Sequence, residues 1–135
     1  MTGHRTSFTS THPSLVDARH LVERFATDAG FSEVDVFDIV IAVGEACTNA
    51  VMHAATDDGF WVDCDYRDGM LTVQVHDFGP GFSLDGRGVY IEPHLRKSGG
   101  LGIYIMRVLM DEVTYEMSDD GTTVTLVKRA NAGNP

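Results

Sequence analysis

A carboxylate and a carboxamide stand four residues apart in a stretch of the chain with helical periodicity. They are Glu45 and Asn49, in the segment 44–53 (GEACTNAVMH). A four-residue offset in a helix places two side chains about 5–6 Å apart on one face, and here that face borders the apolar stripe of the same helix. Such a pair can supply a base and an oxygen ligand for a hard cation. The alternative interpretation is an exposed pair on a solvated helix, which is common.

An acidic residue and two glycines stand at the end of a segment of alternating polarity. Asp77 opens the segment 77–82 (DFGPGF) and is in phase with the apolar residues before it. Its carboxylate is therefore expected to point toward the core, where an unpaired charge is costly and requires a hydrogen-bond donor. Gly79 and Gly81 would let the backbone pass close to a flat ligand without an intervening side chain. The alternative interpretation is a turn that ends the strand, with Asp77 capping its own backbone.

A third candidate site is the run 98–102 (SGGLG), which leads directly into an apolar helical segment. Backbone N–H groups at a helix N-terminus, made accessible here by Gly99, Gly100 and Gly102, form an anion site suited to phosphates. The run lacks the Lys-Ser/Thr pair of a Walker loop. The alternative interpretation is a flexible hinge.

The segment 83–98, which precedes this run, shows no convincing periodicity. It contains three cations, among them Arg96 and Lys97, and two acids, a local charge of +1 in a chain whose net charge is −10. A cationic loop beside an anion site is what the lid of a nucleotide site would look like. The alternative interpretation is an ordinary surface loop, although loops of this length are uncommon unless they are functional or disordered.

Periodicity predicts the elements that must position these residues. Apolar residues recur at helical spacing in two long segments near the N-terminus, and alternation of apolar and polar residues marks two later segments. Asp68-Gly69 joins these two alternating segments as a tight hairpin turn. Two further strands are expected near the C-terminus, joined by a turn at 118–121. Because at least two strand pairs are hairpins, the pattern fits a two-layer α/β sandwich better than a doubly wound parallel sheet. The expected elements are an extended segment at 5–10, helices at about 12–29, 33–51 and 101–110, and strands at 60–67, 70–77, 112–117 and 122–129.

Composition limits the class of protein. The chain has 135 residues and a formal net charge of −10, with 43% apolar and 22% charged residues. These values are typical of one globular domain, expected to span residues 1–135. The negative charge argues against direct nucleic-acid binding, so a macromolecular partner is expected to be a protein. No apolar run suggests a membrane span and the N-terminus has no apolar signal core, which predicts a cytoplasmic location, and Cys47 and Cys64 are expected to be buried free thiols.

The motifs occur together, in one order, and together they resemble a known family. Glu45-x-x-x-Asn49, Asp77-x-Gly79-x-Gly81, the run 99–102 and finally Gly121-Thr122 are similar to the N box and glycine boxes of the GHKL (Bergerat) ATP-binding fold. Within that superfamily the chain most resembles the anti-sigma-factor serine/threonine kinases of the RsbW type. The resemblance extends from about residue 8 to residue 128 and implies an α+β two-layer fold with a mixed, mainly antiparallel sheet covered on one face by about three helices.

The resemblance also implies a role for each motif residue. Asn49 would coordinate Mg²⁺, Glu45 would act as the base toward the attacking group, and Asp77 would accept the adenine amino group. Thr122 would support adenine through its hydroxyl. The remaining nucleotide contacts would come from Gly79 and Gly81 at the base, from Gly99, Gly100, Leu101 and Gly102 near the phosphates, and from Arg96 and Lys97, which are candidates by charge alone.

The function implied is that of an anti-sigma-factor kinase. Such a protein transfers phosphate from ATP, with Mg²⁺, to a Ser or Thr hydroxyl of an antagonist protein, and it also sequesters a sigma factor, usually as a homodimer. No direct contact with nucleic acid or membrane is implied. The alternative hypothesis is a nucleotide-binding regulator that sequesters a protein partner with little or no kinase activity. The presence of both Glu45 and Asn49 favours the enzyme, because a pure binder has no chemical need for the glutamate.

Overall fold

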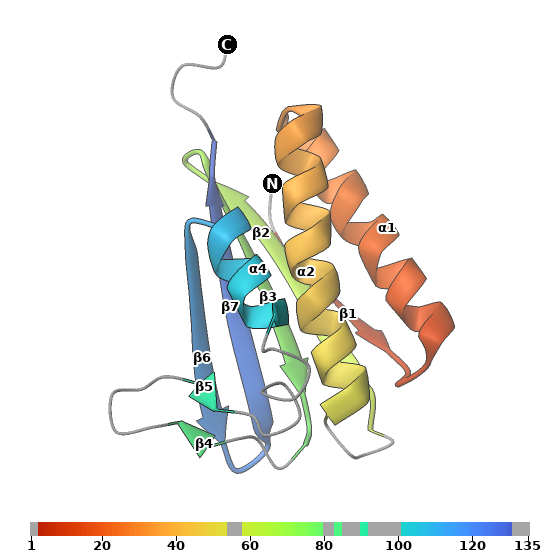
Figure 1. The fold of residues 1–135 in the computed structure, drawn as a ribbon. Helices are drawn as coiled ribbons and strands as arrows, with labels where there is room; N and C mark the ends of the chain where they lie inside the picture. The colour runs from red at the N-terminus through yellow and green to blue at the C-terminus, as the bar shows by residue number, and fades with distance from the viewer. Residues whose placement is uncertain (1–2, 54–57, 80–82, 85–89, 92–100, 131–135) are drawn as a thin grey trace.

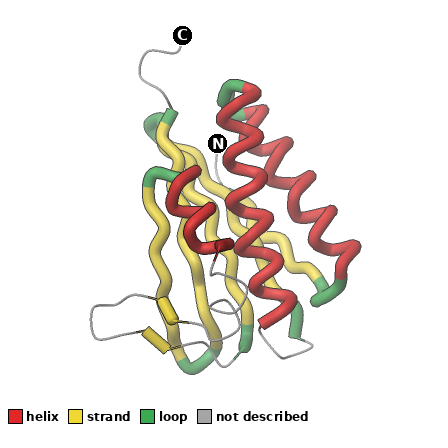
Figure 2. The backbone as a smooth tube through the Cα atoms, in the orientation of Figure 1, coloured by secondary structure: helices red, strands yellow, loops and turns green. Residues whose placement is uncertain are grey.

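The computed structural model describes residues 3–53, 58–79, 83–84, 90–91 and 101–130. Five strands form one sheet and three helices cover one of its faces (Figures 1 and 2). The two-layer sandwich predicted from the sequence is therefore confirmed. A mixed, mainly antiparallel sheet was expected. Among the described strands every pairing is antiparallel.

The elements lie close to their predicted positions, and the predicted bounds of the central hairpin coincide with the observed ones. The strand order in the sheet is β1-β2-β3-β7-β6, so β7, the last strand in the sequence, pairs with β3 in the middle of the sheet. The helices are α1 His12–Asp28, α2 Glu33–His53 and α4 Leu101–Leu109, and the sheet strands are β1 His4–Phe8, β2 Phe60–Arg67, β3 Met70–Asp77, β6 Glu112–Ser118 and β7 Gly121–Arg129.

Local sequence signals account for the ends of α1 and for the hairpin between β2 and β3. The Thr11 side chain caps α1 by accepting a hydrogen bond from the Ser14 N–H. Gly30, with φ +98°, ends α1 in the left-handed conformation that favours glycine. Asp68 and Gly69, with φ of 51° and 76°, form the tight turn that the Asp-Gly pair predicts.

The core lies between α1, α2 and the inner face of the sheet. Ile39, Val43 and Cys47 repeat at helical spacing along α2 and are completely buried. Cys47 and Cys64 are free and buried, as expected, and burial raises the pKa of each thiol to about 12. Both thiols are therefore protonated at neutral pH and serve as small apolar side chains.

The other face of the sheet carries no described helix and is covered by side chains of the sheet itself. The rings of Trp61 and His76 stack with centroids 4.9 Å apart, and the Arg5 guanidinium lies 3.7 Å from the Trp61 centroid. The His76 Nδ1 is hydrogen-bonded to the Thr123 hydroxyl at 2.7 Å. These contacts explain why a histidine on this face is only 5% exposed.

Two short strands within the segment 83–98 were not expected. β4 Ser83–Leu84 pairs antiparallel with β5 Tyr90–Ile91 in a separate two-stranded sheet. Strands of two residues are too short to show a period, so periodicity could not predict them. Among the described helices, none combines the length and the apolar composition that crossing a membrane requires.

The packing of α2 on the sheet gives a first testable prediction. Ile39 is 0% exposed and Val34, on the same helix, is 70% exposed. Replacing Ile39 with alanine leaves a cavity in the core and should lower the free energy of unfolding by about 2–5 kcal/mol. Val34→Ala should change it by less than about 0.5 kcal/mol. Urea unfolding of both variants would measure this, and equal effects would contradict the described packing.

Candidate functional site

Glu45 and Asn49 lie in the second half of α2, and both side chains are half-buried. The residues beside them in the sequence, Ala46, Cys47 and Ala50, are buried against the core. The pair therefore occupies the border between the buried stripe of α2 and its surface, as the sequence predicts. A fully solvated pair on an exposed helix face is not what the structure contains.

The Glu45 side chain lies across the first turn of α4. A Cβ atom added to Gly102 would be 2.9 Å from the Glu45 Oε2 and 3.8 Å from the Glu45 Cδ. Any side chain at position 102 would therefore displace the carboxylate. This contact brings together two motifs that are more than fifty residues apart in the sequence, and a side chain at position 102 would change where the Glu45 carboxylate lies.

Asp77 and Thr122 are paired across neighbouring strands. They are register partners in β3 and β7, on the sheet face that the helices cover. Asp77 is half-buried, and Thr122 is 4% exposed with a hydroxyl that has no hydrogen-bond partner in the described part of the chain. Thr123 points to the other face, where it bonds His76. Strand phase thus places Thr122, and not Thr123, beside Asp77.

The Asp77 carboxylate both caps its own backbone and faces the helix-covered side of the sheet, the two arrangements that the sequence offers as alternatives. Its Oδ1 accepts a hydrogen bond of 2.9 Å from the Gly79 N–H, so Asp77 does cap its own backbone. It also faces the helices and is half-buried. Burial raises the pKa of the Asp77 carboxyl, while the Gly79 N–H and the nearby His76 act in the opposite direction. The group is therefore held in surroundings that oppose its charge.

Gly121 also contributes to this geometry, although the sequence indicates it only as part of the Gly121-Thr122 motif. It has φ +140°, and a Cβ atom there would collide with the backbone carbonyl oxygen of Asp77. Only glycine therefore lets β7 begin directly against the end of β3. Its position after Asp119-Asp120 had indicated a turn, but the close approach to Asp77 depends on a strand pairing that the sequence does not display.

The elements that carry the motifs meet at one end of the fold. Figure 1 shows the C-terminal end of α2, the C-terminal end of β3, the start of β7 and the start of α4 at the same end, near β4 and β5. The structure brings Glu45 to Gly102, and Asp77 to Gly79 and Thr122. Leu101 is the first residue of α4. Several predicted site residues lie outside the described residues: Gly81, Arg96, Lys97, Gly99 and Gly100.

Comparison with known proteins identifies the family. The family model described as histidine kinase-like ATPase domain matches residues 8–128. The chain is 38% identical to the serine-protein kinase RsbW of Bacillus licheniformis in an alignment of 117 residues that covers 78% of this chain and 72% of that protein. The chain belongs to this kinase family. The RsbW kinases of Bacillus subtilis and Listeria monocytogenes are 38% and 37% identical over similar spans.

Solved structures support the fold of this family member. The RsbU and RsbW domains of a Mycobacterium tuberculosis protein align over 96% of this chain with a TM-score of 0.74 and 22% identity, and this chain spans 32% of that one. The SiaB–SiaC complex of Pseudomonas aeruginosa aligns over 92% of this chain and 88% of that chain, with a TM-score of 0.66 and 8% identity. At these identities the likeness concerns the fold alone.

The described residues fit the ATP that this kinase family uses. The buried Thr122 hydroxyl lacks a partner, and the adjacent Asp77 carboxyl lies where its charge is disfavoured. A ligand that donates a hydrogen bond to this pair would satisfy both groups. Among the residues that the structure describes, no group of three or more His, Cys, Asp and Glu side chains could hold a metal ion.

The unpartnered hydroxyl of Thr122 leads to a prediction about stability. Thr122→Val removes a buried hydroxyl that has no partner, so the free energy of unfolding without nucleotide should stay the same or rise by up to about 1 kcal/mol. Thr123→Val is the matched control, because it breaks the 2.7 Å bond to the buried His76. The control should lose about 1–3 kcal/mol. Similar losses in both variants, measured by urea unfolding, would show that Thr122 is already bonded.

The raised pKa of Asp77 leads to a prediction about pH. Because folding raises this pKa above its value in the unfolded chain, roughly 3.9, ionisation of Asp77 weakens the fold as pH rises from the unfolded value through the folded one. Asp77→Asn keeps an oxygen for the Gly79 N–H and removes the charge. Its free energy of unfolding, relative to the parent, should therefore increase as pH rises above about 4.

The control for this experiment is Asp119→Asn, which makes the same change of net charge at an exposed turn position. Urea unfolding at several pH values would compare the two variants with the parent. A relative stability of Asp77→Asn that falls as pH rises would contradict a carboxyl destabilised by burial.

Proposed function

We propose that this chain is a Mg-ATP-dependent protein kinase that phosphorylates a Ser or Thr hydroxyl of an antagonist protein and also sequesters a sigma factor. The names of its RsbW relatives support the kinase activity. The single observation that carries the proposal is the half-buried Glu45 carboxylate lying against the first turn of α4 at Gly102. A carboxylate at the N-terminus of a phosphate-binding helix would repel the phosphates and weaken their binding. Its presence there therefore favours a catalytic role over a role in binding alone.

In this proposal the adenine lies at the pair formed by Asp77 and Thr122. The Asp77 carboxylate accepts the adenine amino group, and the Thr122 hydroxyl, which lacks a protein partner, completes the contact. The backbone at Gly79 and Gly81 passes close to the base. Nucleotide binding then supplies the hydrogen bond that the Thr122 hydroxyl does not find within the described protein, and a second donor for the Asp77 carboxylate, which already accepts from the Gly79 N–H.

The phosphates lie at the start of α4. The N–H groups at a helix N-terminus, together with its dipole, attract anions. Asn49 is the residue proposed to hold Mg²⁺, which when bound would neutralise phosphate charge. The other proposed phosphate contacts come from Gly99, Gly100, Leu101 and Gly102, with Arg96 and Lys97 as the cationic residues of a lid at about 83–98.

Glu45 acts on the attacking hydroxyl. The substrate oxygen forms a bond to the γ-phosphorus of ATP, the bond from that phosphorus to the bridging oxygen of ADP breaks, and the hydroxyl proton passes to the Glu45 carboxylate. Positioning provides most of the rate enhancement in such reactions. Gly102 acts here as a positioning residue, because the space left by its missing side chain is occupied by the carboxylate.

The proposed partners are proteins. A net charge of −10 disfavours a nucleic-acid backbone as the direct target, which agrees with sequestration of a sigma factor as a protein. We also propose a homodimer and a cytoplasmic location, as the resemblance to the RsbW kinases implies.

Glu45→Gln provides the test of the enzyme. The change keeps the size and polarity of the side chain and removes the base, so ATP affinity should change by less than about threefold while phosphotransfer falls by about 10²–10⁴-fold. An ATP-dependent pull-down followed by phosphosite mapping would first identify the substrate protein. Calorimetry with Mg-ATP and mass spectrometry of the phosphorylated substrate would then compare the variant with the parent.

The control for this experiment is Glu116→Gln, an exposed glutamate on β6, which should leave both quantities unchanged. Undiminished transfer by Glu45→Gln would show that the base is another group. Tight ATP binding by the parent with no transfer to any captured partner would instead indicate the alternative function, a nucleotide-dependent regulator that sequesters its partner without phosphorylating it.

A further inference from the structure

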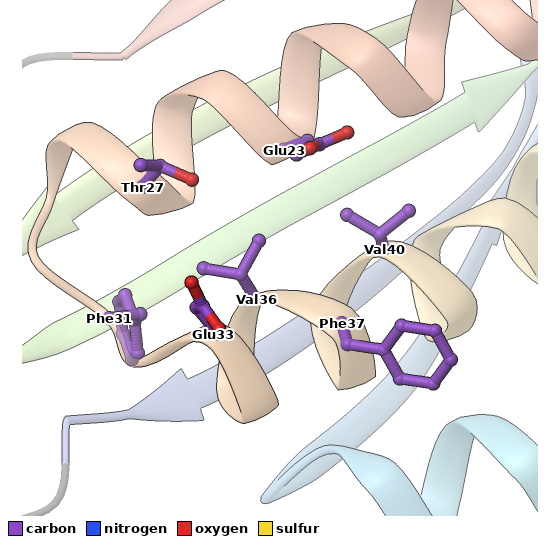
Figure 3. A pocket seen from close by; sticks show the side chains of 7 residues that line it. All are labelled: Glu23, Thr27, Phe31, Glu33, Val36, Phe37 and Val40. Carbon is purple, nitrogen blue, oxygen red and sulfur yellow. The ribbon is translucent and has the colours of Figure 1, made fainter.

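A hollow lies between the C-terminal half of α1 and the N-terminal half of α2. Its volume is about 430 Å³. Figure 3 shows Glu23 and Thr27 on α1 facing Val36 and Val40 on α2 across this space. We call it the α1–α2 groove. The residues that line it are Glu23, Thr27, Phe31, Glu33, Val36, Phe37 and Val40.

The floor and outer rim of the groove are apolar. Val36 is buried, and Phe31 and Val40 are partly buried against the core. On the rim, the Phe37 ring extends from α2 on the side away from α1 (Figure 3) and is 66% exposed. Val34, one turn earlier, is 70% exposed. Leaving a phenylalanine in water instead of burying it forgoes a favourable free energy of burial, which a partner could recover on docking.

The groove is also acidic. Glu23 on α1 and Glu33 on α2 are among its lining residues, and no lysine or arginine is. Residues 23–40 contain five acids and one arginine, a net charge of −4. The single arginine, Arg24, and His20 line the neighbouring hollow on α1, which shares Glu23 with the groove and includes Asp28. The potential of this surface therefore favours a cationic occupant.

The groove is remote from the candidate nucleotide site. Asn49 comes thirteen positions after Val36 in α2, and at a rise of about 1.5 Å per residue this is roughly 20 Å along the helix axis. An occupant of the groove would therefore leave ATP and the hydroxyl that approaches Glu45 unobstructed. The groove is a separate surface, and the proposed phosphotransfer does not depend on it.

We propose that the α1–α2 groove is a docking site for a cationic amphipathic helix of a protein partner. Apolar side chains of that helix would lie on Val36 and Val40 and against Phe37, and Lys or Arg side chains beside them would face Glu23 and Glu33. A second copy of this chain would bring the same carboxylates together and is disfavoured by their repulsion. An anionic lipid surface is disfavoured for the same reason.

Three fluorescent 18-residue peptides test this proposal. The first carries leucines on one helical face and lysines beside them, the second replaces the lysines with glutamates, and the third replaces the leucines with serines. The first should bind the whole chain, as measured by fluorescence anisotropy, and the other two should bind at least about tenfold more weakly. Equal binding of the second or the third peptide would overturn the charge or the apolar half of the proposal, respectively.

Variants of the chain locate the binding. Phe37→Asp and Glu23→Lys should each weaken binding of the first peptide by about three- to tenfold. Their matched controls are Tyr104→Asp, at a residue that is also 66% exposed, and Glu116→Lys, on the far strand β6. The controls should bind as the parent does. Equal loss in variants and controls would show attraction to the overall negative charge and would overturn the docking site.

Calorimetry and sedimentation test whether the variants are folded and whether the groove serves self-association. Calorimetry with Mg-ATP should give the same affinity for Phe37→Asp, Glu23→Lys and the parent, which shows that the variants are folded independently of any kinase activity. Sedimentation should give the same mass for Phe37→Asp and the parent. Conversion of a dimer to a monomer by Phe37→Asp would assign the groove to self-association and overturn the proposal.

Discussion

The rotation of α2 about its own axis is the constraint on which the candidate site depends. Ile39, Val43 and Cys47 are completely buried, and this fixes which side of the helix faces the sheet. With that rotation, Glu45 lies at the border of the core and meets α4 at Gly102, where a missing Cβ leaves room for the carboxylate. A shift by one residue, about 100°, would bury a charge or expose the core stripe, and both are costly.

The two faces of the sheet differ in hydrogen bonding at this end of the molecule. Thr122 and Thr123 are neighbours in β7 and face opposite sides. The Thr123 hydroxyl is bonded to His76, which is itself held by Trp61, whereas the Thr122 hydroxyl is buried without a partner beside the half-buried Asp77. A buried hydroxyl with no partner among the described residues and the half-buried carboxylate beside it, next to Gly121, are a pair of groups with which a ligand could form hydrogen bonds.

The sequence predicted the parts of the fold that local periodicity controls. The stripe of α2, the β2–β3 hairpin and its Asp68-Gly69 turn were all predicted, because helical and alternating patterns and left-handed turn residues are local properties. The pairing of β7 with β3 in the middle of the sheet is not local. This pairing produces the tight contact between Gly121 and Asp77, and it determines that Thr122 faces the helices. The motifs themselves were visible, and the contact of Glu45 with Gly102 was not, since it joins two helices distant in the chain.

The exposed apolar residues of α2 are explained neither by the core nor by the nucleotide site. An amphipathic helix packed on one side is expected to be polar on the other, but α2 carries exposed apolar side chains at Val34 and Phe37 in its first half and at Met52 near its end. Glu33 and Asp35 lie in the first turn, where their charge favours the helix dipole, so local stability accounts for them. It does not account for Glu23, which comes from α1 and faces the same groove. Acidic side chains from two helices beside exposed apolar ones would complement a cationic amphipathic helix of a partner.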